Sequence, residues 1–123
     1  MKQVMPQEIE VWYLIPALRK ELAKIFLKDY GMSQKEIANL LGLTESAVSQ
    51  YIRNKRGNEL KFNSSDLKII NLYAKKINDD RKNSLKNIYE LCYSLKKNKV
   101  LCALHKIHNN KLPKECNLCS MKN

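Results

Sequence analysis

The stretch SQKEIANLLGLTESAVSQYIRNKRG, residues 33–57, decides the fold of this chain. Ser33 followed by Glu36 is a capping box, in which each side chain can satisfy an exposed backbone N–H at the start of a helix. Gly42 permits the positive φ of a tight turn, and Thr44 can cap the helix that follows. The stretch therefore predicts two short helices joined by a turn of three residues.

The apolar residues of this stretch fit a tightly packed helix pair. Ala38 is small at the point where the two helices must approach each other, and the second helix is expected to end near Lys55, closed by Gly57. The space between the two helices would be filled by the apolar side chains of Ile37, Leu41, Leu43, Val48 and Ile52. The pattern is typical of a helix-turn-helix, and packing alone establishes the motif but not its use.

The polar residues of the second helix indicate a use. In a DNA-bound helix-turn-helix this face lies in the major groove. Gln50 can pair with adenine and Arg53 with guanine, and Ser46 can bond either base. Glu45 could accept from cytosine or favour the positive end of the helix. The residues expected to face DNA are Gln34, Thr44, Glu45, Ser46, Ser49, Gln50, Arg53, Lys55 and Arg56.

Helical spacing of apolar residues continues through most of the chain, so we expect an all-α protein: a helix-turn-helix bundle followed by a helical C-terminal region. A helix from Pro16 to about Tyr30 should precede the pair, and EIEVWYLI before it could be helical or extended. Ser64 or Ser65 should cap a fourth helix, and a fifth should begin near Ser84. The expected domains are 1–60, which binds DNA, and 61–123, which forms a dimer.

Charge is distributed unevenly along the chain. The net charge is +11, with nine basic against seven acidic residues in 1–60 and fourteen against five in 61–123. Such an excess favours a polyanionic partner. The longest uncharged N-terminal stretch has eight residues, far short of the ~20 that span a membrane, and nothing resembles a signal peptide. We therefore expect a cytoplasmic protein.

Two longer stretches carry a family resemblance. Residues 33–57 resemble the helix-turn-helix of the Cro/C1 repressor (XRE) superfamily, and VWYLIPALRKELAK through AVSQYIRNKRG resembles a group of predicted archaeal transcriptional regulators. The resemblance implies sequence-specific binding of double-stranded DNA, usually as a homodimer. It also implies that Glu45, Ser46, Gln50 and Arg53 face bases and that Gln34 and Arg56 face the backbone.

The four cysteines all lie in the last third of the chain, at Cys92, Cys102, Cys116 and Cys119. The C-x-x-C at the end can bring two thiolates to one ion, which predicts a metal or cluster site. Zinc could use the smaller set of Cys102, His105, Cys116 and Cys119, whereas an iron–sulfur cluster could use all four cysteines. Resemblance to regulators with clusters beside a helix-turn-helix slightly favours a redox-sensing 4Fe-4S cluster. Cys92 could instead be a small buried residue.

Cys92 and Cys102 can bind at one site only if the fifth helix breaks between them. In a continuous helix the two residues would be ~15 Å apart along the axis. Lys96 to Lys99 is a polar, weakly helical run, and Asn98 could take the left-handed conformation of a helix end. We expect the break there, with Val100 to His108 folding back. The fourth and fifth helices are the expected dimer surface, through Leu67, Ile70, Ile77, Leu85 and Ile88.

Two other readings remain open, a zinc-stabilised DNA-binding or coactivator module that does not sense, and an RNA-binding factor. An enzyme is not expected, because the sequence contains no Ser/His/Asp set, phosphate loop or paired carboxylates in an apolar pocket. No small-molecule substrate is expected either.

Overall fold

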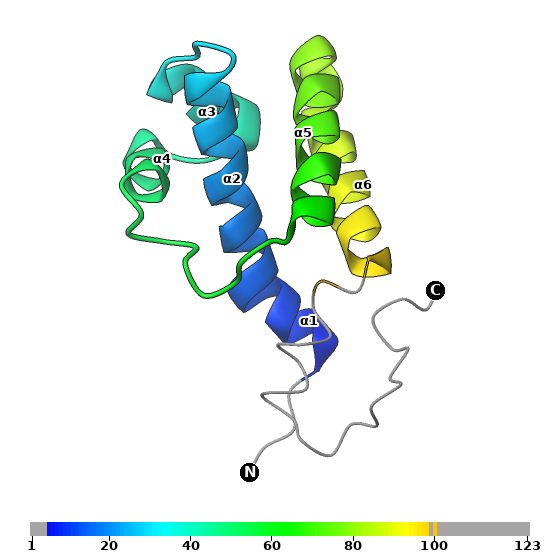
Figure 1. The fold of residues 1–123 in the computed structure, drawn as a ribbon. Coiled ribbons are helices and arrows are strands. Elements are labelled where there is room, and N and C mark those ends of the chain that lie inside the picture. The colour runs from blue at the N-terminus through cyan, green and yellow to red at the C-terminus, as the bar shows by residue number, and fades with distance from the viewer. Residues whose placement is uncertain (1–4, 99, 101–123) are drawn as a thin grey trace.

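The helix α2, Ile15–Lys28, lies at the centre of the fold, and helices from both ends of the chain pack against it. The computed structural model describes residues 5–98 and Val100, and within them it contains helices and no strands. Figure 1 shows α4 on one side of α2 and the pair α5 and α6 on the other, while α3 packs on α2 and also contacts α6. The prediction of an all-α fold built around a helix-turn-helix bundle is confirmed.

The segment before α2 is helical, which the sequence left undecided. It consists of the short α-helix α1, Pro6–Ile9, and the π-helical turn η1, Glu10–Leu14, which leads directly into α2. Ile9 and Leu14 are fully buried, so this lead-in contributes to the core. Pro16 is the second residue of α2, and because the helical conformation runs into α2 from η1, the prediction that a helix begins at Pro16 is wrong.

The helix α3, Gln34–Leu41, begins with the predicted capping box. The N–H of Glu36 donates to Ser33 Oγ at 3.1 Å, and the N–H of Ser33 donates to Glu36 Oε1 at 3.2 Å. The helix ends at Gly42, whose φ of 69° is the left-handed conformation that the turn requires. These local signals were sufficient to place both ends of α3.

The helix α4, Glu45–Ile52, begins as predicted, with Thr44 Oγ1 accepting from the N–H of Ala47 at 3.1 Å. It ends three residues earlier than expected. Asn54 takes a left-handed φ of 61°, and the chain leaves the helix axis there. The prediction that Gly57 closes this helix is therefore wrong, and Gly57 instead lies against α2.

The helix α5, Ser64–Asp79, is capped one residue before the predicted serines. Asn63 Oδ1 accepts from the N–H of Asp66 at 2.8 Å, and Asp66 Oδ2 accepts from the N–H of Asn63 at 3.2 Å. This second capping box, which buries Asp66, replaces the expected cap at Ser64 or Ser65. A short 3₁₀ turn η2, Arg81–Asn83, then leads into α6, Ser84–Lys97.

The predicted helix break is confirmed, because α6 ends at Lys97 with Asn98 as its cap. Asn98 has a φ of −80°, so the left-handed conformation expected for it is wrong. Its side-chain amide donates to Asp66 Oδ1 at 2.6 Å, which ties the end of α6 to the start of α5. The predicted fold-back beyond Val100 lies outside the described residues.

Buried residues from both ends of the described chain form one hydrophobic cluster. Ile70 and Ile77 of α5 are fully buried within the chain, as are Leu91 and Leu95 of α6. The expectation that Ile70 and Ile77 form a dimer surface is therefore wrong, since both side chains pack inside the chain. None of the described helices is long and apolar enough to cross a lipid bilayer.

The capping box of α3 makes stability depend on acidity. The backbone N–H of Ser33 holds the pKa of the Glu36 carboxyl below its ordinary value near 4.5, an effect that partial desolvation opposes and Arg81 reinforces. A lowered pKa stabilises the folded protein above pH 4.5, and that contribution is lost as pH falls through the folded-state value.

Thermal melts across pH 3–6 should therefore show a loss of stability that Glu36→Gln reduces. Ser33→Ala should cost about 1 kcal/mol at pH 7, because the N–H of Glu36 loses its acceptor. Identical acid dependence in wild type and Glu36→Gln would contradict this account of the capping box.

Candidate DNA-binding surface

The packing of α3 against α4 holds the turn between them rigidly. Leu43 donates its N–H to the carbonyl of Ala38 at 2.9 Å, so the chain reverses immediately after Gly42. Ala38 is 4% exposed, and Ile37 and Val48 are fully buried between the helices. The angle between α3 and α4 is therefore set by close packing, which fixes the direction of the polar face of α4.

That polar face carries most of the predicted DNA-facing residues. Thr44, Glu45 and Ser46 are exposed at the start of α4, where a helix entering the major groove places its base contacts. Ser49 and Gln50 follow on the same face and are half-buried. In the part of the chain that the structure describes, the Gln50 amide has no hydrogen-bond partner, which leaves its donors and acceptor available.

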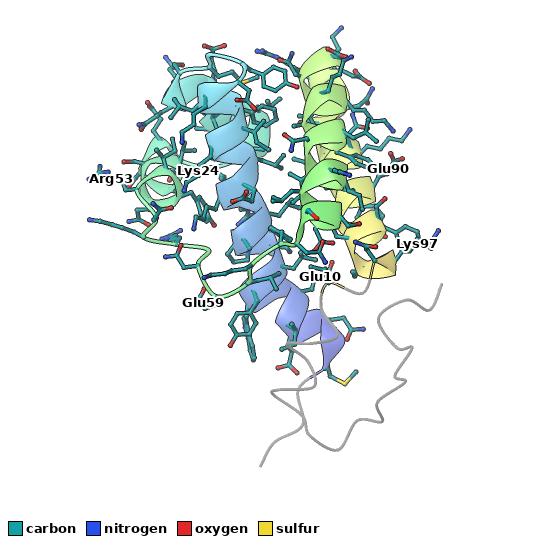
Figure 2. The ribbon with its side chains drawn as sticks, viewed as in Figure 1. Glu10, Lys24, Arg53, Glu59, Glu90 and Lys97 are labelled. Atoms are coloured by element: carbon teal, nitrogen blue, oxygen red, sulfur yellow. The ribbon has the colours of Figure 1, made fainter. Side chains whose placement is uncertain are left out.

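Arg53 lies just beyond the last residue of α4 and is exposed. Figure 2 shows its side chain projecting from α4 on the side away from α2. Its Nε and one terminal nitrogen donate to Ser49 Oγ at 3.0 and 2.6 Å. This fork onto a neighbouring hydroxyl holds the guanidinium along the helix and leaves further N–H donors for a ligand.

A network from α2 fixes the chain that follows α4. Lys24 Nζ donates to Asn54 Oδ1, and Lys20 Nζ donates to Asn58 Oδ1 at 2.6 Å. Asn58 Nδ2 in turn donates to the carbonyl of Asn54 at 2.6 Å. The two asparagines thus link the segment that follows α4 to the two lysines one helical turn apart on α2, where Figure 2 places Lys24 between the helices.

Gly57 adds a further contact between this segment and α2, because its backbone packs directly against the start of α2. A Cβ at Gly57 would stand 2.5 Å from the carbonyl oxygen of Pro16, and the residue has a φ of +77°. Sequence analysis missed this network, since polar contacts between residues 30 or more apart leave no local pattern. The positions of Lys55 and Arg56, both exposed, depend on it.

The remaining predicted DNA-facing residue, Gln34, is exposed as the first residue of α3. The first turn of α3 presents backbone N–H groups that a phosphate can accept, apart from the one that Ser33 occupies. The structure thus exposes Gln34 and the residues from Thr44 to Arg56 that sequence analysis selected, with Ser49 and Gln50 partly covered. Cations dominate the end of this surface at Arg53, Lys55 and Arg56.

Cys92 is the one predicted metal ligand within the described residues. It is 9% exposed near the end of α6, and burial raises the pKa of its thiol to about 11, with a smaller contribution from Glu10. Lys96 and Arg19 lie close enough to oppose that rise. Residues 5–98 contain no group of three or more potential ligands, and Cys102, His105, Cys116 and Cys119 lie outside the described residues.

Comparison with known proteins supports the use of this surface. The family model described as sigma-70, region 4, which is a helix-turn-helix DNA-binding region, matches residues 8–54. No curated protein and no solved structure matches the chain significantly. The matched range covers α2, α3 and α4, so the chain contains a helix-turn-helix DNA-binding region of a kind that acts in transcription.

Proposed function

We propose that this protein is a sequence-specific transcription regulator that reads double-stranded DNA with α4. The observation that carries the proposal is the exposed polar face of α4 on a closely packed helix-turn-helix. Gln50 would pair with adenine and Arg53 with guanine, while Ser46 and Glu45 lie at the helix start nearest the bases. Gln34 and Arg56 would contact phosphates on either side.

This proposal is tested by selecting preferred sites from random duplex DNA with the full chain. We expect enrichment of a short consensus and an affinity that falls steeply with salt. Competition with bulk RNA provides the control, because RNA should compete far less well than the selected duplex at equal nucleotide concentration. Equal competition by RNA would replace the proposal with an RNA-binding function.

We also propose that the protein binds DNA as a homodimer. One α4 offers few base contacts, so a second copy on a pseudo-palindrome would supply the missing specificity. The half-sites should lie about one helical turn apart, ~10 base pairs. Mass measurement of the free protein and of its complex with the selected duplex should give two chains per duplex. A single chain on a symmetric site at micromolar concentration would contradict the dimer.

The C-terminal cysteines are proposed to form a sensing site. Cys92, Cys102, Cys116 and Cys119 would hold an iron–sulfur cluster, which when bound supplies a redox-sensitive group beside the DNA-binding region. One observation supports a role for Cys92. The helix α6 ends five residues after it, so the chain that follows α6 has room to return to this position.

Metal and sulfide analysis of protein purified without oxygen tests this site. We expect iron and acid-labile sulfide in equal amounts, both lost in Cys92→Ser. Melting of wild type and Cys92→Ser after removal of metal gives the control for folding, since Cys92 is buried. A colourless protein that holds zinc equally well with and without Cys92 would favour the set Cys102, His105, Cys116 and Cys119.

A further inference from the structure

The outer face of α6 is a surface that DNA reading does not use. It carries Leu85, Tyr89 and Tyr93, which follow one another at intervals of four residues and therefore lie on one side of the helix. Leu85 is 82% exposed and Tyr89 is 74% exposed, the two highest values among the large hydrophobic residues described. Leu91 and Leu95 on the opposite side are fully buried, so this face points away from the core.

The same face is strongly basic. Lys86 is exposed next to Leu85, and Lys82 is exposed in the turn η2 that leads into α6; neither has a carboxylate partner among the described residues. Lys97 Nζ lies over the ring of Tyr93, 5.3 Å from its centroid, which is within the range of a cation–π contact. Glu90 is the one acidic residue within α6, and Figure 2 shows Glu90 and Lys97 both projecting on the side of α6 away from α2.

We propose that this face, defined by Lys82, Leu85, Lys86, Tyr89 and Lys97, docks an acidic protein partner that also presents apolar side chains. Leu85 and Tyr89 form an apolar pair for anchor residues of the partner, and the lysines around them would meet its carboxylates. An amphipathic helix with glutamates beside a leucine stripe has this chemistry and can lie along α6. The lysines would steer the encounter, and the apolar pair would supply most of the affinity.

The chemistry of the face argues against other occupants. Nucleic acid could meet the lysines and stack on Tyr89, but Leu85, the more exposed of the two, offers a base neither a stacking ring nor a hydrogen bond. A symmetric contact through this face would bring the lysines of one copy near the same lysines of the other. α4 and α6 lie on opposite sides of α2 (Figure 1), while the start of α6 lies near α3, where Arg81 Nη1 is 3.6 Å from Glu36 Oε2.

The test measures binding of a labelled synthetic helical peptide, with a leucine stripe flanked by glutamates, to the full chain by fluorescence anisotropy. We expect saturable binding that Leu85→Ser together with Tyr89→Ala weakens by about tenfold or more. Lys86→Glu should also weaken binding, and the same peptide with lysine in place of glutamate should not bind. Melting temperature should be unchanged because these side chains are exposed, and DNA affinity should be unchanged in the Leu85→Ser, Tyr89→Ala variant, which keeps the net charge.

Matched variants on α5 provide the control. Leu72→Ser removes a residue that is 57% exposed, and Lys75→Glu reverses an exposed charge, so both should leave peptide binding unchanged. Failure of the peptide to bind, or equal losses in the α5 and α6 variants, would overturn the proposal. It would also be overturned if Tyr89→Ala weakened binding of polyuridylate instead, or if Leu85→Ser converted a dimer to a monomer.

Discussion

Replacement of Gln50 or Arg53 by alanine is expected to lower affinity for the preferred DNA site by about 1–3 kcal/mol each, roughly 5- to 150-fold, and to relax preference at the base each contacts. Both side chains lie on the polar face of α4, and truncating either leaves the base edge without its partner. The measurement is equilibrium binding to the selected duplex and to single-base variants of it. Unfolding should be nearly unaffected by Arg53→Ala, since Arg53 is exposed.

Arg53 allows a finer test, because its guanidinium already bonds Ser49 Oγ in the free protein. Arg53→Lys keeps the charge and removes the planar fork, so it should lose base preference while retaining most of the non-specific affinity. Arg56→Ala is the matched control, and it should weaken all sequences alike and reduce the salt dependence. If Gln50→Ala and Arg53→Ala both preserved the consensus, α4 would not be the reading helix.

The second large effect is expected at Gly57, where alanine should destabilise the fold by about 2–4 kcal/mol. A side chain at a φ of +77° costs about 1–2 kcal/mol, and a Cβ 2.5 Å from the backbone oxygen of Pro16 adds an overpacking cost of similar size. The atoms of Pro16 that the Cβ would meet are the backbone O and C, which cannot rotate away. The segment after α4 must therefore move away from α2. Thermal and urea unfolding of both proteins measure the loss.

Gly31→Ala provides the matched control for this prediction. Gly31 has a φ of +63°, close to that of Gly57, but no atom lies within 4 Å of the position of its Cβ. Its substitution should therefore cost only the conformational term, about 1–2 kcal/mol. Gly57→Ala should in addition weaken binding of all DNA sequences, because Lys55 and Arg56 directly precede Gly57 and would move with it. Equal stability losses at the two glycines would contradict the contact with Pro16.

The helix-turn-helix was predictable because its signals are local. Ser33, Glu36, Gly42 and Thr44 each act on backbone groups within four residues, and the structure gives them the expected roles. The polar face of α4 follows from the same spacing, since residues three and four apart share a face. The sequence therefore contained both the motif and the side chains that its exposed face presents.

Other features depend on contacts between distant residues and could not be predicted in the same way. Gly57 looked like a helix terminator, but its place is set by Pro16, forty-one positions earlier in the chain. Ile70 and Ile77 looked like an unpartnered stripe because the sequence does not show that α5 packs on α2 and α6. The cap of α5 is different, because the box of Asn63 with Asp66 three residues later is a local signal, and the prediction of a cap at Ser64 or Ser65 misread it.

The most direct test of the central claim is the mapping of backbone amide chemical-shift changes in the full chain as its selected duplex is added. If α4 reads DNA, the largest changes should fall on Thr44 to Ser49 and on Gln50 and Arg53, with smaller ones at Gln34 and Arg56. The outer face of α6, including Leu85 and Tyr89, should remain unchanged. The largest changes on α5 and α6, with α4 unaffected, would contradict the account.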